Sequence, residues 1–321
     1  MIPKRLLAEI RKKSNKVFLL SAHIHLEGDA LGSELALASL LKRLGKKVIV
    51  YDEDAPPSEY NFLPGIEGVV TKDPGIDYDV AIFVDCSDCS RVGKVHKALN
   101  SKKLLMNIDH HVSNSFFGDV NWVEGGASSA CEMIYELFQA FKVKINKKEA
   151  ILLYTGMMTD TGGFKFANTT SRTHEAAASL LKSGLDVYRI HRRIYETMSF
   201  ETVKCYGKII QSLKTDPSGK VAWLEIPYSL LSKSDVLAQQ TDAIIHFARC
   251  IEGVEVALLF KEIHRAQEVR VNFRSTGIVD VNKIAAVFGG GGHKMASGAT
   301  LKGNFKNIIA RVVEESAKRS V

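Results

Sequence analysis

Carboxylate and imidazole side chains follow several of the apolar runs in the first half of the chain. They are His23, Glu27 and Asp29 after the run 17–22, Asp85 at the end of 79–85, and Asp109, His110 and His111 at the end of 104–109. A further carboxylate, Asp160, ends an apolar stretch with helical spacing. Gathering so many carboxylates without a cation is costly, because like charges repel and burial penalises charge. The pattern therefore indicates a site for divalent cations.

The ligand types narrow the choice of ion and reaction. Mixed oxygen and nitrogen ligands without a thiolate suit Mn²⁺ or Mg²⁺ better than a structural zinc. A carboxylate that bridges two such ions would let them hold an attacking hydroxide, which is the arrangement for phosphoryl transfer to water. A single Asp after a strand is more often a helix cap or turn residue. We nevertheless interpret these residues as metal ligands rather than as caps or turn residues, because they recur at the same end of successive predicted strands.

A parallel sheet would bring these side chains together. The first half alternates short apolar runs with amphipathic stretches, which is typical of parallel strands joined by helices. The predicted strands are 17–22, 47–51, 79–85 and 104–109, and the predicted helical stretches are 30–44, 128–141 and 147–181. Ligands of such sheets bind beyond the carboxyl ends of the strands, near the point where the strand order reverses. The sequence thus predicts an α/β fold with a doubly wound parallel sheet.

The second half predicts a smaller α/β domain. After a charged helical stretch at 184–211 and a turn at 216–219 come strands 221–226, 254–260 and 268–274, helix 281–287, a glycine-rich loop at 289–292 and helix 305–318. We expect a metal-binding domain over 1–190, a helical linker over 191–215 and a substrate-binding domain over 216–321. The two domains are expected to face each other across a cleft.

Arginine and glycine residues of the second half could bind phosphate. Arg270 and Arg274 have even spacing on one predicted strand, so they share a face, and arginine binds phosphate in a bidentate manner. In the run 289–292 the backbone amides can approach a ligand closely because no Cβ intervenes. A glycine run alone could be a flexible turn. Together with Arg274 and the adjacent His293, it indicates a substrate clamp.

Composition limits the class of protein. The 321 residues are 45% hydrophobic and 25% charged, as in ordinary globular proteins. Residues 1–190 hold 24 Lys and Arg against 23 Asp and Glu, whereas 191–321 hold 19 against 13, so the net charge of +7 lies mostly in the second half. The sequence has no run of 18 apolar residues and an odd number of cysteines, five. We expect a cytoplasmic protein without a membrane segment or a disulfide framework.

Five motifs, in order along nearly the whole chain, resemble those of the DHH phosphoesterase superfamily. They are 23–33, 84–85, 109–111 (Asp-His-His), 159–164 and, in the second half, the Gly-Gly-Gly-His stretch 290–293 with Arg274-Ser275 upstream, which resembles a DHHA1 domain. This order is far more specific than any one motif. The resemblance implies the same pair of domains in this chain.

The resemblance also implies roles for individual residues and a pair of Mn²⁺ ions, with Mg²⁺ as the alternative. His23, Glu27 and Asp85 would hold one ion, and Asp29, Asp85, His110 and Asp160 the other. Asp109 would orient an imidazole, and His111 would contact the scissile phosphate. Arg274, Ser275, Gly290, Gly291, Gly292 and His293 would bind the substrate. Position 27 departs from the family, which commonly has Asp there, so Glu27 would ligate directly or through water.

Length and domain pairing are most similar to the NrnA-type proteins of the superfamily. These hydrolyse short oligoribonucleotides (nanoRNA) to mononucleotides and remove the 3′-phosphate of 3′-phosphoadenosine 5′-phosphate (pAp), and resemblance alone suggests a homodimer. The alternatives are a phosphodiesterase for pApA or cyclic di-AMP, and a single-strand exonuclease of the RecJ type. A non-catalytic nucleotide- or RNA-binding protein would be expected to lack the ligands. A nicotinamide-dependent enzyme would carry G-x-G-x-x-G after the first strand, and this chain does not.

Overall fold

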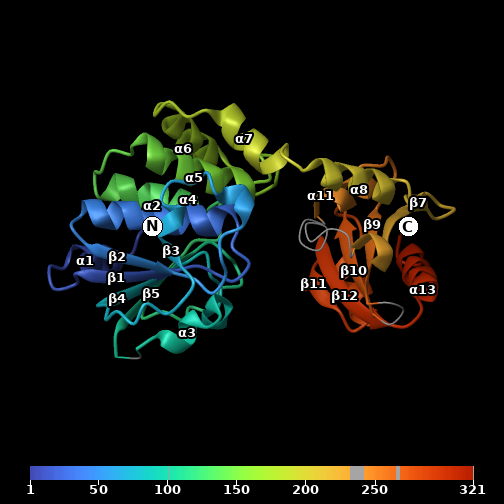
Figure 1. The fold of residues 1–321 in the computed structure, drawn as a ribbon, viewed down its shortest axis with the longest axis horizontal. Helices are drawn as coiled ribbons and strands as arrows, with labels where there is room; N and C mark the ends of the chain where they lie inside the picture. The colour runs from blue at the N-terminus through green and yellow to red at the C-terminus, as the bar shows by residue number, and fades with distance from the viewer. Residues whose placement is uncertain (101, 232–241, 265–267, 321) are drawn as a thin grey trace. The chain divides into compact units, whose positions relative to one another are not determined.

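The computed structural model of the protein describes residues 1–100, 102–231, 242–264 and 268–320 (Figure 1). It divides into two compact units, Met1–Thr197 and Met198–Val321. The stretch 191–215, predicted as a linker, is divided between them, because helix α7 (Val187–Tyr195) belongs to the first unit and α8 (Phe200–Ile210) to the second. Among the described residues, no helix combines the length and apolarity that crossing a membrane requires.

The first unit is built on a six-stranded, all-parallel sheet. Its strands are β1 (Val17–Ser21), β2 (Lys47–Tyr51), β3 (Val69–Val70), β4 (Val80–Val84), β5 (Leu104–Asp109) and β6 (Val120–Val123). The order is β3-β2-β1-β4-β5-β6, so the direction of winding reverses between β1 and β4. The predicted doubly wound sheet is confirmed, and its ligand-binding edge lies beyond the carboxyl ends of β1 and β4.

Both faces of this sheet are buried, which explains the near-continuous apolar runs. In β4, Val80, Ile82 and Val84 point into one core, and Ala81 and Phe83 into the other. The larger core lies under α1 (Lys4–Arg11), α2 (Gly28–Arg43), α4 (Ala130–Ala140), α5 (Lys147–Asp160) and α6 (Ser171–Leu181). The smaller core lies against α3 (Val95–Ala98), on the other side of the sheet in Figure 1.

Helices α2 and α5 pack closely because glycines line their contact. A Cβ atom on Gly32 would lie 2.6 Å from the carbonyl oxygen of Leu152, and one on Gly156 would lie 2.8 Å from Asp29 Oδ1 of α2 and would also collide with Cys131 Sγ of α4. A Cβ on Gly28 would collide with Thr159 near the carboxyl end of α5. The amino end of α2 therefore meets the carboxyl end of α5.

The second unit has a mixed six-stranded sheet in the order β11-β12-β10-β9-β8-β7. Its strands are β7 (Lys214–Thr215), β8 (Val221–Ile226), β9 (Val256–His264), β10 (Glu268–Ser275), β11 (Gly291–His293) and β12 (Ala296–Lys302), and its further helices are α9 (Tyr228–Leu231), α11 (Asp242–Arg249), α12 (Val281–Val287) and α13 (Phe305–Ala317). Among the described strands of this sheet, β8 and β9 pair in parallel and the other neighbours are antiparallel. The predicted loop 289–292 is wrong in part, because Gly291 and Gly292 belong to β11 and pair with β12.

Candidate metal centre

The predicted ligands converge at the carboxyl edge of the parallel sheet. His23 follows β1, Asp85 follows β4, and His110 and His111 follow β5; Glu27 and Asp29 begin α2, and Asp160 ends α5. Three sets of these side chains place ligand atoms within 4.8 Å of one another and could hold metal ions. The sets are Asp85, His110 and His111; His23, Glu27 and Asp85; and Asp29, His110 and Asp160.

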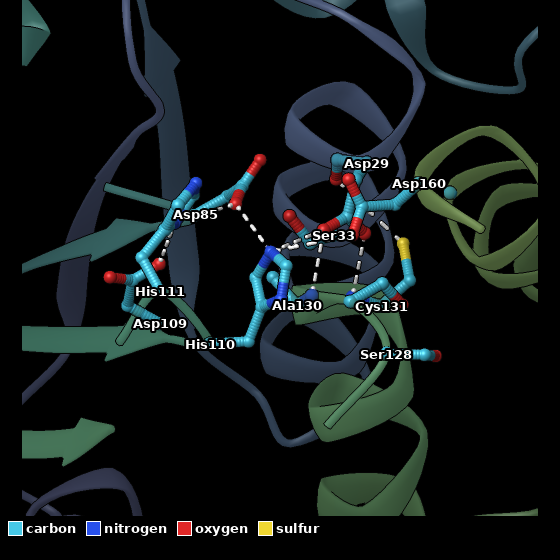
Figure 2. Close-up of polar contacts among 12 residues, drawn as sticks. Asp29, Ser33, Asp85, Asp109, His110, His111, Ser128, Ala130, Cys131 and Asp160 are labelled. Carbon is cyan, nitrogen blue, oxygen red and sulfur yellow. Dashed lines mark hydrogen bonds and ion pairs between the residues drawn. The ribbon is translucent and has the colours of Figure 1, made fainter. Parts of the chain in front are cut away.

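Asp85 contacts three imidazoles of the cluster, two of which, His110 and His111, are labelled beside it in Figure 2. Its Oδ2 is 3.3 Å from His23 Nε2, and its Oδ1 is 3.3 Å from His110 Nε2 and 3.6 Å from His111 Nδ1. Its backbone is left-handed (φ 51°), an unfavourable conformation for a residue other than glycine that is found most often at functional sites. Oδ1 is buried and accepts no hydrogen bond from any residue that the structure describes. A cation would be a fitting partner for this oxygen.

Glu27 begins helix α2 and caps it. Its Oε1 accepts the backbone N–H groups of Asp29 and Ala30, at 2.8 and 2.9 Å. The longer side chain thus performs the capping that a shorter Asp commonly performs, and Oε2 is the oxygen that remains for the cluster. His23 is held on the same side by a 2.7 Å contact from Nδ1 to the carbonyl oxygen of Ile24, which leaves Nε2 toward Asp85.

Asp29 is held by a second helix. Its two carboxylate oxygens accept the backbone N–H groups of Ala130 and Cys131, in the first turn of α4, at 2.7 and 2.8 Å. The partial positive charge at that helix end stabilises the buried carboxylate. Asp29 therefore joins the first turns of α2 and α4, as Figure 2 shows.

His110 faces three carboxylates from three different elements. Its Nε2 lies 3.3 Å from Asp85 Oδ1, 3.6 Å from Asp160 Oδ2 and 3.8 Å from Asp29 Oδ2 (Figure 2). Asn168 donates to the backbone carbonyl of Asp160 at 3.2 Å and to that of Ser128 at 2.9 Å. This amide ties the end of α5 to the segment that precedes α4.

Crowding of charge shifts the protonation of the cluster. Burial alone would lower the pKa of His23, but its contact with Asp85 raises that pKa to about 9; the same balance raises the pKa of His110 to about 10. Burial, followed by repulsion from Asp85, raises the pKa of both Glu27 and Asp29 to about 7. The protein alone thus holds protons where cations would let the carboxylates ionise, which fits a metal centre.

A second chain of hydrogen bonds runs beside the cluster. Asp109 Oδ1 lies 2.7 Å from His111 Nδ1, and its Oδ2 accepts a 2.6 Å hydrogen bond from the side-chain amide of Asn114. That amide also donates to Asn107 Oδ1 at 2.8 Å. Because Asp109 engages Nδ1, the nitrogen that His111 can present to a ligand is Nε2. Sequence reasoning missed Asn114, although it lies only three positions after His111.

The predicted substrate-binding residues of the second unit lie on neighbouring strands. Ala296 of β12 pairs with Arg274 of β10 on one side and with His293 of β11 on the other. Arg274 and Arg270 share the less buried face of β10, as predicted, and His293 is exposed. Ser275 points to the opposite, buried face, where its hydroxyl accepts the N–H of Gly277. The structure therefore groups Arg274 with His293 and does not bring Ser275 to their face.

The glycine run makes the pairing of β11 with β12 possible. A Cβ on Gly290 would collide with the carbonyl oxygen of Gly298. Gly292 has φ 148°, and a Cβ there would lie 2.6 Å from the carbonyl oxygen of Ala296. Gly291 has no such conflict, since the nearest atom would be 3.9 Å away.

Comparison with known proteins identifies the family of both domains. Residues 17–157 match the family model for the N-terminal domain of the DHH family. The chain is also 31% identical to the bifunctional oligoribonuclease and PAP phosphatase NrnA of Bacillus subtilis (strain 168), over 286 residues that make up 88% of each protein. This chain belongs to the DHH family. Residues 220–318 match the DHHA1 domain model, so the second unit carries the domain that the Gly-Gly-Gly-His stretch predicts.

Two further relatives match almost the whole chain. The NrnA of Thermus thermophilus, with the same description, is 31% identical over 316 residues, which cover 97% of this chain and 92% of that protein. The crystal structure of an exopolyphosphatase-related protein from Bacteroides fragilis has a TM-score of 0.88 and 25% identity, and the match covers 98% of this chain and 95% of that one. The resemblance read from the motifs is confirmed at the level of the DHH family and of both domains.

One predicted ligand lies outside the match to the DHH model. That match ends at residue 157, three positions before Asp160. The packing of α5 on α2 nevertheless brings Asp160 to His110.

All five cysteines are free thiols, as expected for a protein without a disulfide framework. Cys86 and Cys89 do not bond to each other: the Cys86 thiol contacts the carbonyl oxygen of Asp88, and the Cys89 thiol contacts the ring of His96.

Proposed function

We propose that this protein is a metal-dependent phosphoesterase that hydrolyses short oligoribonucleotides to mononucleotides and removes the 3′-phosphate of pAp. The observation that carries the proposal is the buried Asp85, whose two oxygens face three imidazoles and whose Oδ1 lacks a hydrogen-bond donor among the described residues. The NrnA proteins of Bacillus subtilis and Thermus thermophilus, each 31% identical to this chain, are named for these two activities.

We infer that the cluster holds two Mn²⁺ ions, with Mg²⁺ as the alternative. His23, Glu27 and Asp85 would hold one ion, and Asp29, Asp85, His110 and Asp160 the other. Support comes from the donor set, which combines oxygen and nitrogen without sulfur. Bound ions would supply a nucleophile at neutral pH and offset charge on the phosphoryl group.

The protein's own side chains would position the substrate and move a proton. His111 would contact the scissile phosphate through Nε2, because Asp109 engages Nδ1 at 2.7 Å. Asp109 also raises the pKa of His111, so the ring can carry a proton that Nε2 donates to the phosphate or the leaving oxygen. Asn114 would keep Asp109 in place through the 2.6 Å hydrogen bond to its other oxygen.

The DHHA1 domain would bind the terminal nucleotide. We assign the contact to Arg274, His293 and the backbone of Gly290, Gly291 and Gly292, because the pairing of β10, β12 and β11 brings these residues together. Ser275, predicted as a direct contact, would act by stabilising the turn that follows β10. Closure of this face on the metal centre across a cleft stays a prediction, as do a homodimer and a cytoplasmic location.

The test is hydrolysis of labelled di- to pentaribonucleotides and of pAp with Mn²⁺, with the Asp85→Ala variant as the control. We expect mononucleotides and adenosine 5′-phosphate from the wild type and no product above background from the variant. Full activity of Asp85→Ala would refute the assignment. Faster hydrolysis of pApA or cyclic di-AMP would favour the dinucleotide alternative, and progressive shortening of long single strands would favour the RecJ-type alternative.

A further inference from the structure

Helix α7 carries three arginines on one exposed face. Arg192 and Arg193 follow Arg189 by three and four residues, so the three side chains lie on the same side of the helix. The opposite side is buried, and Ile190 there is only 4% exposed. Tyr188 lies beside the arginines and is 69% exposed. We call these four residues, Tyr188, Arg189, Arg192 and Arg193, the arginine face.

Among the described residues, no carboxylate pairs with the guanidinium groups of the arginine face. Within the part of the chain that the structure describes, none of the three guanidinium groups forms an ion pair or a side-chain hydrogen bond. The nearby carboxylates are engaged elsewhere: Asp186 caps the helix by accepting the N–H of Arg189, and Glu196 pairs with His191 at 3.4 Å. Like charges at this spacing destabilise a helix.

Another arginine of the same unit shows the contrast. Arg172 lies within 3.0 Å of carboxylate oxygens from Glu124, Glu132 and Glu136. This arginine is neutralised inside the fold and has a structural role. The arginine face lacks such partners among the described residues, so an external anion would be its natural counterpart.

The arginine face borders a hollow of about 450 Å³. The hollow is lined by Asp186, Tyr188, Arg189, Arg192, Arg193 and Thr197. Three guanidinium groups suit phosphate oxygens, and an exposed tyrosine ring suits the face of an unstacked base. A phosphodiester backbone that carries unstacked bases is the chemistry of single-stranded RNA.

Helix α7 ends at the metal centre. The hydroxyl of Tyr195, its last residue, donates to the carbonyl oxygen of Met158 at 3.1 Å, two residues before Asp160. At 1.5 Å per residue, Arg192 lies about 4.5 Å and Arg189 about 9 Å along the helix from Tyr195. An RNA strand whose end is at the metal centre would therefore reach the arginine face within a few nucleotides.

We propose that the arginine face of α7 binds the backbone phosphates of the RNA nucleotides beyond the one being cleaved. The proposal rests on the proposed oligoribonuclease function and adds a separate binding site to it. A substrate of one nucleotide, such as pAp, has no phosphate that extends to this face. The arginine face would thus favour oligoribonucleotides over pAp.

The test compares two triple variants that remove the same charge. One is Arg189→Gln, Arg192→Gln, Arg193→Gln. The matched control is Lys142→Gln, Lys144→Gln, Lys147→Gln, at a second basic hollow of about 660 Å³. That hollow lies at the start of α5, whose 14 residues separate it by about 20 Å from Asp160. The measurements are kcat/KM for a pentaribonucleotide and for pAp, and binding of a fluorescein-labelled pentaribonucleotide by anisotropy.

We expect the arginine variant to lower the ratio of pentaribonucleotide to pAp kcat/KM about tenfold or more, and to weaken anisotropy binding as strongly. The slope of log affinity against log salt should fall in magnitude by about 2, since each lost phosphate contact on a single strand contributes about 0.7. The lysine control should retain the wild-type ratio.

The possible failures are distinguishable. If the wild type hydrolysed neither substrate, the proposed function would be wrong, and the anisotropy difference between the two variants would still decide the arginine face. Equal loss with pAp and with the pentaribonucleotide would mean a damaged metal centre and would overturn the proposal. Unchanged RNA binding would also overturn it and would direct the search for a partner toward acidic proteins.

Discussion

The two units of this protein prepare for a phosphorylated ligand in opposite ways. The DHH unit buries its chemistry: Asp29 and Asp85 are almost inaccessible, and strands and helices far apart in the sequence contribute to the cluster. The DHHA1 unit presents the half-buried Arg274 and the exposed His293 on either side of β12 and uses glycines for close backbone pairing. Burial strengthens electrostatic effects on an ion, whereas an exposed face lets a large anion enter and leave. The contrast predicts different consequences for mutations in each unit.

Replacement of Asp85 should have the largest effect. In Asp85→Asn the carboxylate that would bind both ions loses its charge, so we expect hydrolysis to fall by about a thousandfold or more. Titration calorimetry should show weakened Mn²⁺ binding. The two tryptophans separate the units, since Trp122 lies in the DHH unit and Trp223 in the DHHA1 unit. Mn²⁺ should raise the urea concentration at which the Trp122 fluorescence of the wild type reports unfolding, and should not do so for the variant. Unchanged Mn²⁺ binding by the variant would contradict the assignment of Asp85 as a metal ligand.

Replacement of Arg274 should affect substrate binding and leave the metals in place. We expect Arg274→Ala to raise KM ten- to a hundredfold, because a bidentate phosphate contact is lost. Arg270→Ala is the matched control on the same face of β10, where it pairs with Thr300, away from β11. Steady-state kinetics and Mn²⁺ titration check both variants. Equal effects of the two substitutions would argue against a site centred between Arg274 and His293.

An alanine at Gly290 should destabilise the DHHA1 unit alone. Its Cβ would collide with backbone atoms of Gly298 and Ala299, and such overpacking costs about 2 kcal/mol. In Gly291→Ala the Cβ meets nothing closer than 3.9 Å, so this control should unfold like the wild type. Urea unfolding in a Trp122→Phe background follows Trp223 only. A shift of the Trp122 transition when Gly290→Ala is placed in a Trp223→Phe background would contradict the independence of the two units.

The smallest effect concerns two buried carboxyl groups outside the metal centre. Burial and repulsion from Asp52 raise the pKa of Glu34 well above its usual value, and burial raises that of Asp52 to about 6. Both carboxyl oxygens of Glu34 and Oδ2 of Asp52 are buried without a hydrogen-bond partner among the described residues, so a proton on Glu34 would give this pair a donor. The folded protein keeps a proton that the unfolded chain releases, so this pair loses stability as pH rises above about 4.5.

Glu34→Gln replaces that proton by a permanent amide donor. Between pH 5 and pH 8 we expect the free energy of unfolding to fall less in the variant than in the wild type, by about 1 kcal/mol. The exposed Glu67→Gln serves as the control and should follow the wild-type curve. Parallel curves for the wild type and Glu34→Gln would show that the pair shares no proton.

Most of the helices and strands and all of the candidate ligands could be predicted from local sequence patterns. The predicted strands 47–51 and 104–109 and the helix 281–287 coincide with β2, β5 and α12, because alternation and helical periodicity report local burial. The strand at 120–123 was not predicted, since its half-buried VNWV has no long apolar run. Strand β12 was missed because its small residues, in ASGATLK, carry little apolar pattern.

Which strand and helix ends lie next to each other depends on packing between elements, which local patterns do not report. The position of β1 beside β4 brings His23 to Asp85, and the glycine contact between α2 and α5 brings Asp160 to His110, 50 residues away in the chain. The support of Asp109 by Asn114, the burial of Ser275 and the exposed arginines of α7 likewise follow from packing. Periodicity describes the surroundings of a residue along one element, whereas a site depends on strand order and helix contacts between elements that the local pattern does not contain.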